Sequence, residues 1–238
     1  LVQSVVGRRD ELVIARYSAV PFYRQLADDL ALQGSRLINS WAAHQYLANF
    51  DYYHDVVGHT PQTWWRLSDV PRDSGPWVVK GVTNSKKHDW FGSMYAATWD
   101  DLIRVYRALG QDTYIGEQDL IIRQYVPLVQ YGESIGGLPV TNEWRFFFYH
   151  GQLLSYGYYW SNFDATGSLD AAGQLFAQQM ADRICPQCPF VAIDIAQRVD
   201  GTWILIEVND GQMAGLSGND PEVLWVALAP LVQTRGHR

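Results

Sequence analysis

Hydrophobic and polar positions alternate in the first part of the chain in a way that predicts two strands with a helix between them. Residues 11–20 and 35–40 are typical of strands, whereas residues 21–34 have the apolar spacing of a helix. This order favours a small parallel sheet. Residues 40–57 have large side chains at helical spacing and predict a second helix.

From residue 76 onward the pattern predicts an antiparallel arrangement. The expected strands are 76–85, 119–128, 143–160 and 190–210, and the expected helices are 98–110 and 169–183. Two of these segments contain hairpin signals, His150-Gly151 and Asp200-Gly201. The architecture is therefore α+β with a small α/β front end. We place the boundary in the loop 68–76, which divides the chain into 1–70 and 71–238.

Composition and charge narrow the class of protein. The chain has 238 residues, and 47% of them are hydrophobic, which is enough for a substantial core. Its net charge of −7 argues against a broad nucleic-acid-binding surface. No apolar run approaches the roughly 18–20 residues that span a bilayer, so we expect a soluble, cytoplasmic protein without membrane contact. Leu1 is not a methionine, which leaves open that residues precede it.

Cys185 and Cys188 are the two cysteines of the chain and form a single C-x-x-C. One such pair supplies half of a tetrahedral zinc site, and the sequence contains no second pair. We interpret them as two semi-buried thiols in a proline-rich turn.

The last hairpin brings oxygen-bearing side chains together. If Asp200 and Gly201 are the central residues of a type I′ turn, Arg198 faces Trp203 and, further along, Asp194 falls opposite Glu207. Because side chains alternate along a strand, Asn209 lies on the same face as Glu207. Opposed residues have Cβ atoms about 4.5–5.5 Å apart, so these three side chains converge.

Two converging carboxylates need a positive partner. Hard oxygen ligands without histidine or cysteine suit Mg²⁺ or Mn²⁺, whose remaining positions are filled by water or phosphate oxygens. The alternative is a surface hairpin in which Asp194 and Glu207 pair with neighbouring lysine or arginine side chains.

Cationic side chains interrupt other apolar strands: Lys80, Arg123 and Arg145. A cation within a strand is costly unless it meets an anion, so their recurrence suggests a shared anionic partner such as a phosphate. The polar loop after Lys80 adds Lys86 and Lys87, which are suited to contact a polyphosphate.

The order of these motifs resembles the ATP-grasp superfamily. WVVKG is similar to its phosphate-binding lysine strand, IIRQYVPL to the hinge that holds adenine, and NEWRFFFYHGQLL to the strand that directs an arginine to the terminal phosphate. AIDIAQRVDGTWILIEVNDG resembles the metal-binding hairpin. Arg123, Arg145 and Lys80 together resemble the clade named for two arginines and one lysine. The resemblance implies two α+β subdomains that grip a nucleotide, preceded by a small α/β pre-ATP-grasp domain with a parallel sheet.

The resemblance also implies residue roles. It implies that ATP and Mg²⁺ or Mn²⁺ bind, with the metal held by Asp194, Glu207 and Asn209. The residues implied to contact adenine, mostly through the backbone, are Gln124, Tyr125 and Val126. Those implied to contact phosphates and to act in catalysis are Lys80 and Arg145, with Arg123 reaching a phosphate or the acyl substrate.

Two positions depart from the family pattern. Many relatives carry an earlier lysine where this chain has Phe50-Asp51, and their phosphate loop is rich in glycine, unlike TNSKKH here. We therefore expect Lys86 or Lys87 to supply the missing cation.

The leading hypothesis is an ATP-dependent ligase that converts a small-molecule or peptide carboxylate to an acyl phosphate, which an amine-type nucleophile then attacks. Two alternatives remain at this point. One is a kinase with the same nucleotide site. The other is a nonenzymatic binding module whose aromatic side chains line a groove.

Overall fold

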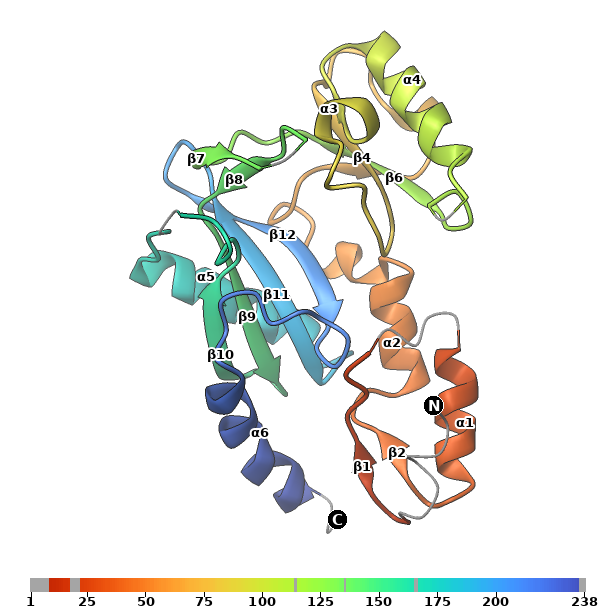
Figure 1. The fold of residues 1–238 in the computed structure, drawn as a ribbon, viewed down its shortest axis with the longest axis vertical. Helices are drawn as coiled ribbons and strands as arrows, with labels where there is room; N and C mark the ends of the chain where they lie inside the picture. The colour runs from red at the N-terminus through yellow and green to blue at the C-terminus, as the bar shows by residue number, and fades with distance from the viewer. Residues whose placement is uncertain (1–8, 18–21, 114, 135, 165–166, 236–238) are drawn as a thin grey trace.

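The computed structural model describes residues 9–17, 22–113, 115–134, 136–164 and 167–235 (Figure 1). The helices are α1 (Tyr23–Ala31), α2 (Trp41–Ala48), α3 (Trp90–Ser93), α4 (Trp99–Gly110), α5 (Ala171–Ile184) and α6 (Pro221–Arg235), with short 3-10 helices at Asp51–Asp55 and Leu67–Asp69. The strands are β1 (Leu12–Val13), β2 (Arg36–Leu37), β3 (Thr63–Trp64), β4 (Trp77–Gly81), β5 (Tyr95–Ala96), β6 (Leu120–Gln124), β7 (Gln130–Glu133), β8 (Pro139–Thr141), β9 (Glu143–Tyr149), β10 (Gln152–Tyr158), β11 (Phe190–Gln197) and β12 (Trp203–Asp210). The expected α+β architecture is confirmed.

The front end is a β–α–β unit, as predicted. β1 and β2 pair in parallel, with Leu12 opposite Arg36, and α1 connects them. Both strands are two residues long, and residues 18–20 of the longer expected strand lie outside the described part of the chain. The helix expected over 40–57 divides into α2 and a 3-10 helix, because Phe50 between them adopts a left-handed conformation with φ 66°.

β3, β6, β4 and β5 form one sheet, at the top of Figure 1. β4 pairs with β6 along its length, so that Val78 faces Arg123 and Lys80 faces Ile121. The alternate residues of both strands, such as Val79, pack in a core with α4. Lys80 and Arg123 therefore lie on the same face of this sheet, opposite to α4.

β10, β9, β11 and β12 form a second, antiparallel sheet. α5 packs on one face of it, in a core that includes Phe146 and Ile193, and α6 packs on the other, in a core that includes Phe147. Both faces are covered, which explains why β9 is a nearly continuous apolar run. The predicted turn at His150-Gly151 joins β9 to β10, and both residues have a positive φ.

The β11–β12 hairpin has a three-residue loop, not the predicted two-residue type I′ turn. The Arg198 amide donates to the Thr202 carbonyl at 2.8 Å, and the Gly201 amide donates to the Arg198 carbonyl at 2.9 Å. Type I′ requires a positive φ at Asp200 as well as at Gly201, and only Gly201 has one, at 86°. The predicted pairing of Arg198 with Trp203 is therefore wrong, since Trp203 pairs one residue earlier in β11.

A β-bulge in β12 restores the expected register further along. Leu205 faces Ile195 and Glu207 faces Asp194, so that Ile206 is the extra residue between them. The predicted opposition of Asp194 and Glu207 is confirmed, because the loop and the bulge each shift the register by one residue in opposite directions.

One hydrophobic core cluster joins the front part of the chain to both four-stranded sheets. It includes Leu47 of α2, Ile121 of β6 and Ile193 of β11. The division of the chain near residues 68–76 stays a prediction. Within the described residues, no helix is both long and apolar enough to cross a membrane.

Candidate functional site

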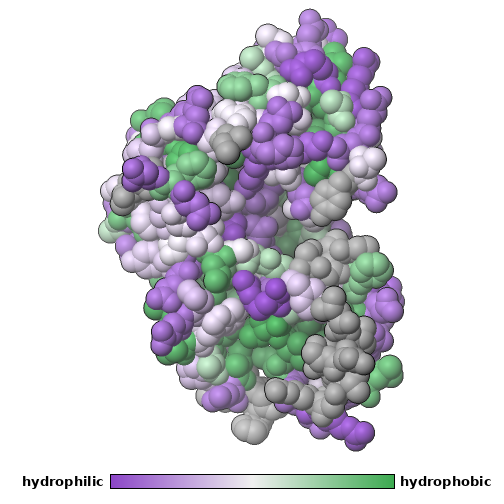
Figure 2. All heavy atoms as spheres, in the orientation of Figure 1, coloured by the Kyte–Doolittle hydropathy of each residue, from purple (hydrophilic) through white to green (hydrophobic). Residues whose placement is uncertain are grey.

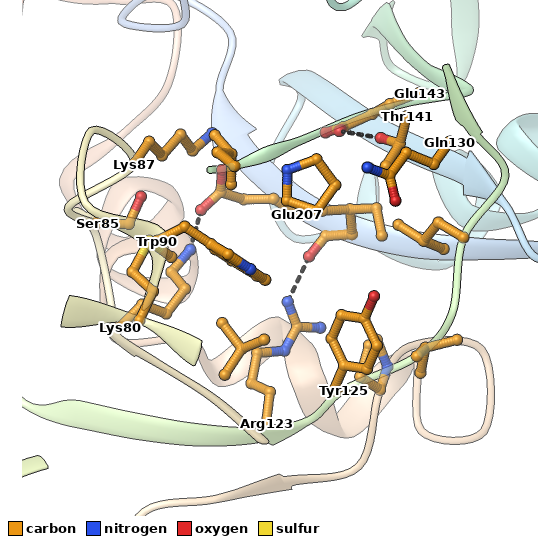
Figure 3. Close-up of a pocket in the computed structure, with 18 of the residues that line it drawn as sticks. Lys80, Ser85, Lys87, Trp90, Arg123, Tyr125, Gln130, Thr141, Glu143 and Glu207 are labelled. Carbon is orange, nitrogen blue, oxygen red and sulfur yellow. Dashed lines mark hydrogen bonds and ion pairs between the residues drawn. The ribbon is translucent and has the colours of Figure 1, made fainter. Parts of the chain in front are cut away.

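A cavity lies between the two sheets (Figure 3). It encloses about 970 Å³ of atom-free space, part of it open to solvent. β4 and β6 form one wall, and β12 with the start of β9 forms the other. The polar residues that line it include Lys80, Lys87, Arg123, Gln130, Thr141, Glu143 and Glu207.

Arg145, Asp194 and Glu207 form one row across three strands. Asp194 is the register partner of Arg145 on β9 and of Glu207 on β12. Arg145 donates from Nε to Asp194 Oδ1 at 2.7 Å and from Nη2 to Oδ2 at 2.6 Å. Burial alone lowers the pKa of Arg145, but the Asp194 carboxylate outweighs it and holds that pKa above its ordinary value. The arginine is therefore fixed and charged.

Lys80 extends this row from the other sheet by an ion pair with Glu207 (Figure 3). Burial lowers the pKa of the Lys80 ammonium. Burial also raises that of the Glu207 carboxyl, but Lys80 and Lys87 outweigh it and bring the pKa of Glu207 well below its usual range. The lowered pKa of Lys80 by itself favours a neutral amine. We nevertheless assign an ionised pair, because Lys87 and Arg145 also stabilise the Glu207 carboxylate.

The Arg123 side chain binds the backbone of β12. Its Nη1 donates to the carbonyl of Ile206, the bulge residue, at 2.6 Å, and its Nη2 donates to Thr60 Oγ1 at 2.6 Å. The guanidinium also lies 5.6 Å from the ring centroid of Phe50, at the position where a family lysine was expected. Arg123 lines the cavity, but the residue is only 6% exposed and most of its side-chain donors face protein acceptors.

The loop lysines have different surroundings. Lys86 pairs with Asp112 and does not contribute to the cavity wall. Lys87 lines the cavity and donates to Tyr159 Oη at 2.6 Å. Burial lowers the pKa of Lys87, but Tyr159 and the nearby Glu207 outweigh it and raise that pKa above its usual value. Lys87 is therefore the loop cation that faces the cavity.

Residues 124–126 line the same cavity, together with Trp90. The amide of Gln124 donates to the Gln62 carbonyl, and that of Tyr125 donates to the Pro76 carbonyl, both at 2.8 Å. The backbone groups that remain for a ligand are therefore the Val126 amide and the carbonyls of the segment.

Glu143 is a cavity residue that the sequence reasoning missed. It is buried, and Thr141 Oγ1 donates to its carboxyl at 3.2 Å. Burial raises the pKa of Glu143 to about 7, although Lys87 opposes this shift. The available signal was its spacing of two from Arg145, which puts both side chains on one face of β9.

Asp194, Glu207 and Asn209 are two carboxylates and one amide on the same face of adjacent strands. Within the described residues, no group of three or more histidine, cysteine, aspartate or glutamate side chains could hold a metal by itself. This set of hard oxygen donors fits Mg²⁺ that is shared with a phosphate-bearing ligand, because Mg²⁺ commonly takes one or two carboxylates. Arg145 pairs with Asp194, and Lys80 pairs with Glu207.

A second cavity lies on the other side of Glu207, which lines both. Arg145 and Asn209 line the second cavity, together with His44 of α2 and Met213. Figure 2 shows this face of the molecule hollowed between the part that carries β4 and β6 and the part that carries β1 and β2, with hydrophilic residues around the hollow. The row of charges thus separates two adjoining spaces.

Neither cysteine lines either of the two cavities. Both thiols are buried and free. Burial raises the pKa of Cys185 to about 11 and that of Cys188 well above its ordinary value, so neither is a reactive thiolate.

Comparison with known proteins gives one family and a set of similar structures. The family model is described as an ATP-grasp domain, family 3 of the clade named for two arginines and one lysine, and it matches residues 66–228. Among curated proteins, no sequence matches this chain.

Three solved structures illustrate the likeness. D-alanine–D-alanine ligase from Bacillus anthracis, complexed with ATP, has a TM-score of 0.58 at 15% identity, over 92% of this chain and 78% of that one. The ATP-grasp ligase PsnB, complexed with a minimal precursor, Mg and ADP, has a TM-score of 0.56 at 12% identity, over 96% and 79%. An L-amino acid ligase from Bacillus licheniformis has a TM-score of 0.53 at 16% identity, over 81% of this chain but 46% of that one. At these identities the likeness shows a shared fold.

Proposed function

This chain belongs to the ATP-grasp domain family, in family 3 of its two-arginine-one-lysine clade, and we propose that it is an ATP- and Mg²⁺-dependent ligase that joins a carboxylate to an amine. The observation that carries the proposal is the row Arg145–Asp194–Glu207–Lys80, which spans both sheets between two adjoining cavities. The solved structures named above are ligases that act on amino acids or carry a precursor peptide, which supports an amino acid or a peptide as the carboxylate.

The first cavity suits the nucleotide. Adenine would lie beside Tyr125, with the Val126 amide and nearby carbonyls as hydrogen-bond partners. Lys80 and Lys87 line the same cavity further along and would contact the phosphates. Arg123 would act on the nucleotide mainly by holding β12 in place.

The metal would bind where the phosphates reach the row of charges. Asp194, Glu207 and Asn209 would hold Mg²⁺, which supplies neutralisation of the charge on the transferred phosphoryl group. Lys80 and Arg145 would exchange part of their present contacts with the acids for contacts with phosphate oxygens.

The reaction would proceed in two transfers. A carboxylate oxygen of the substrate attacks the terminal phosphorus of ATP, and ADP leaves with the bonding electrons. The amine then attacks the acyl carbon, and inorganic phosphate leaves. Positioning and charge stabilisation supply the catalysis, so the protein needs no nucleophile of its own.

Thermal stability with and without MgATP tests nucleotide binding. We expect MgATP to raise the melting temperature and ATP without Mg²⁺ to raise it less. A panel of amino acids is then screened for ADP and inorganic phosphate, which a ligase releases together. ADP without phosphate would identify a kinase, and no shift with MgATP would exclude both.

A further inference from the structure

His44 is buried in the wall of the second cavity. It lies on α2, in the front part of the chain, and 5% of its surface is exposed. Arg145, Glu207 and Asn209 line the same cavity. The proposed function gives His44 no role, although it shares a space with the row of charges.

Two aromatic rings fix the plane of the His44 imidazole. Tyr23 stacks on it with ring centroids 4.0 Å apart and an interplanar angle of 6°, and Trp41 lies at 5.8 Å and 30°. Tyr23 itself is held by a hydrogen bond from its hydroxyl to the Asn39 carbonyl at 2.6 Å. The ring therefore has one defined orientation in the cavity wall.

Asp210 determines which nitrogen of His44 carries the proton. Its Oδ2 lies 3.2 Å from His44 Nδ1, and its other partners are the Asn39 side-chain amide at 2.8 Å, the Gln212 backbone amide at 3.1 Å and the Gln212 side-chain amide at 3.2 Å. All of these groups donate, so we assign Asp210 as an acceptor and Nδ1 as protonated. Neutral His44 then carries its lone pair on Nε2.

Among the described residues, Asp210 at Nδ1 is the one hydrogen-bond partner of the His44 ring, and no fully buried side-chain nitrogen or oxygen lacks a partner, so the unpartnered Nε2 is accessible from the cavity that His44 lines. A carboxylate that orients an imidazole through one nitrogen and leaves the other free is the arrangement that proton-accepting histidines share. The free nitrogen belongs to a residue that lines the second cavity.

We infer that His44, oriented by Asp210, accepts the proton that the protonated amine substrate must lose before it attacks the acyl phosphate. This inference rests on the proposed function. In the step, the protonated amine first passes one proton to His44 Nε2, which frees the nitrogen lone pair, and His44 later releases that proton to solvent. The lone pair then forms the C–N bond, the C–O bond to the phosphate breaks, and phosphate leaves with that electron pair and takes up the second proton from nitrogen.

The acidic residues that line the second cavity are less suited to this role. Glu207 is paired with Lys80 and has a lowered pKa, which makes its carboxylate a weak base. Asp210 is saturated by donors, and Glu117 lies on an exposed part of the wall. Arg145 is a cation and cannot accept a proton. Imidazole is the side chain most used for proton transfer near neutral pH.

Comparison of two nucleophiles tests the inference. Hydroxylamine is already neutral near neutral pH and traps acyl phosphates without needing a base, whereas amino acid amines are protonated. With a panel of proteinogenic amino acids as carboxylates, His44→Gln should lower amide formation about 100-fold and change hydroxamate formation less than about threefold. Equal losses of both products, or unchanged amide formation, would overturn the role of His44.

Tyr46→Phe is the matched control, because it removes a side-chain hydrogen bond from the same helix, that of the Tyr46 hydroxyl to Asp55, at a residue that lines neither cavity. It should affect amide and hydroxamate formation equally. Melting temperatures of both variants show whether they fold. Hydroxamate without any amide from the wild-type protein would overturn an amine acceptor and hence the role of His44. No hydroxamate from any panel member would instead overturn the proposed function.

Discussion

Arg145 of β9 and Asp194 of β11 are register partners, and two hydrogen bonds of 2.7 and 2.6 Å join their buried side chains. The antiparallel ladder itself sets this pairing, so the arginine is oriented before any ligand arrives. A phosphate that engages Arg145 would meet a preorganised cation, which favours catalysis by charge stabilisation.

Removal of Asp194 should destabilise the fold strongly. Asp194→Ala leaves the buried Arg145 guanidinium without its counter-ion, and we expect a loss of about 3–5 kcal/mol in the free energy of unfolding. Urea denaturation measures it. The control is Arg198→Ala, which breaks the exposed pair with Asp200 at the loop of the same hairpin and should leave the free energy of unfolding almost unchanged. Similar losses for both variants would contradict the assignment.

Arg123→Lys should lower stability although it keeps the charge. A lysine cannot donate in parallel to Ile206, Thr60 and Thr63, so buried acceptors lose their partner, at a cost of about 2–3 kcal/mol. Urea denaturation and the KM for ATP are measured together. Unchanged stability with a raised KM would instead indicate direct contact between Arg123 and a phosphate.

Lys87 and Lys86 form a matched pair of variants. Lys87 faces the first cavity, whereas Lys86 is paired with Asp112 outside its wall. We expect Lys87→Ala to raise the Kd for MgATP about tenfold, ~1.4 kcal/mol, and Lys86→Ala to change it less than about threefold. Calorimetric titration gives both constants. The reverse order would assign the phosphate contact to Lys86.

Glu143 should make the fold less stable as the pH rises. Its pKa is raised in the folded state to about 7, from 4.5, so the folded chain binds the proton more tightly than the unfolded chain between these values. Stability contributed by the protonated form is complete below about pH 4.5 and is lost as the pH passes through about 7.

Glu143→Gln removes this dependence. The difference in free energy of unfolding between Glu143→Gln and the wild-type protein should shift in favour of the variant by up to about 3 kcal/mol from about pH 5 to about pH 8. Urea denaturation at the two pH values measures this difference. An equal effect of the substitution at the two pH values would show that the carboxyl is not protonated by burial.

Alternation along the strands was enough to predict which side chains of the last hairpin converge. Asp194, Glu207 and Asn209 share one face, as expected, because their spacing in the sequence carries this information. The turn type was not predictable from Asp200-Gly201, since the same dipeptide fits two-residue and three-residue loops.

Long-range partners could not be predicted. The bulge at Ile206 has no local signature, and its carbonyl is bound by Arg123 from a different sheet. The same holds for His44, which looks like one residue of an aromatic helix until the fold brings it to Asp210. Glu143 carries a spacing signal, but its burial depends on the packing of the other sheet against β9.

Ile206 is an additional residue in β12, and the pairing of Asp194 with Glu207 does not require it. Trp203, Leu205 and Val208 share one core cluster, so the apolar spacing along β12 changes from two to three at this residue. A strand without Ile206 would alternate evenly and would still set Asp194 opposite Glu207. It would lose the carbonyl that Arg123 binds. This one additional residue therefore distinguishes a hairpin that only pairs Asp194 with Glu207 from one that is also hydrogen-bonded, through Arg123, to the neighbouring sheet.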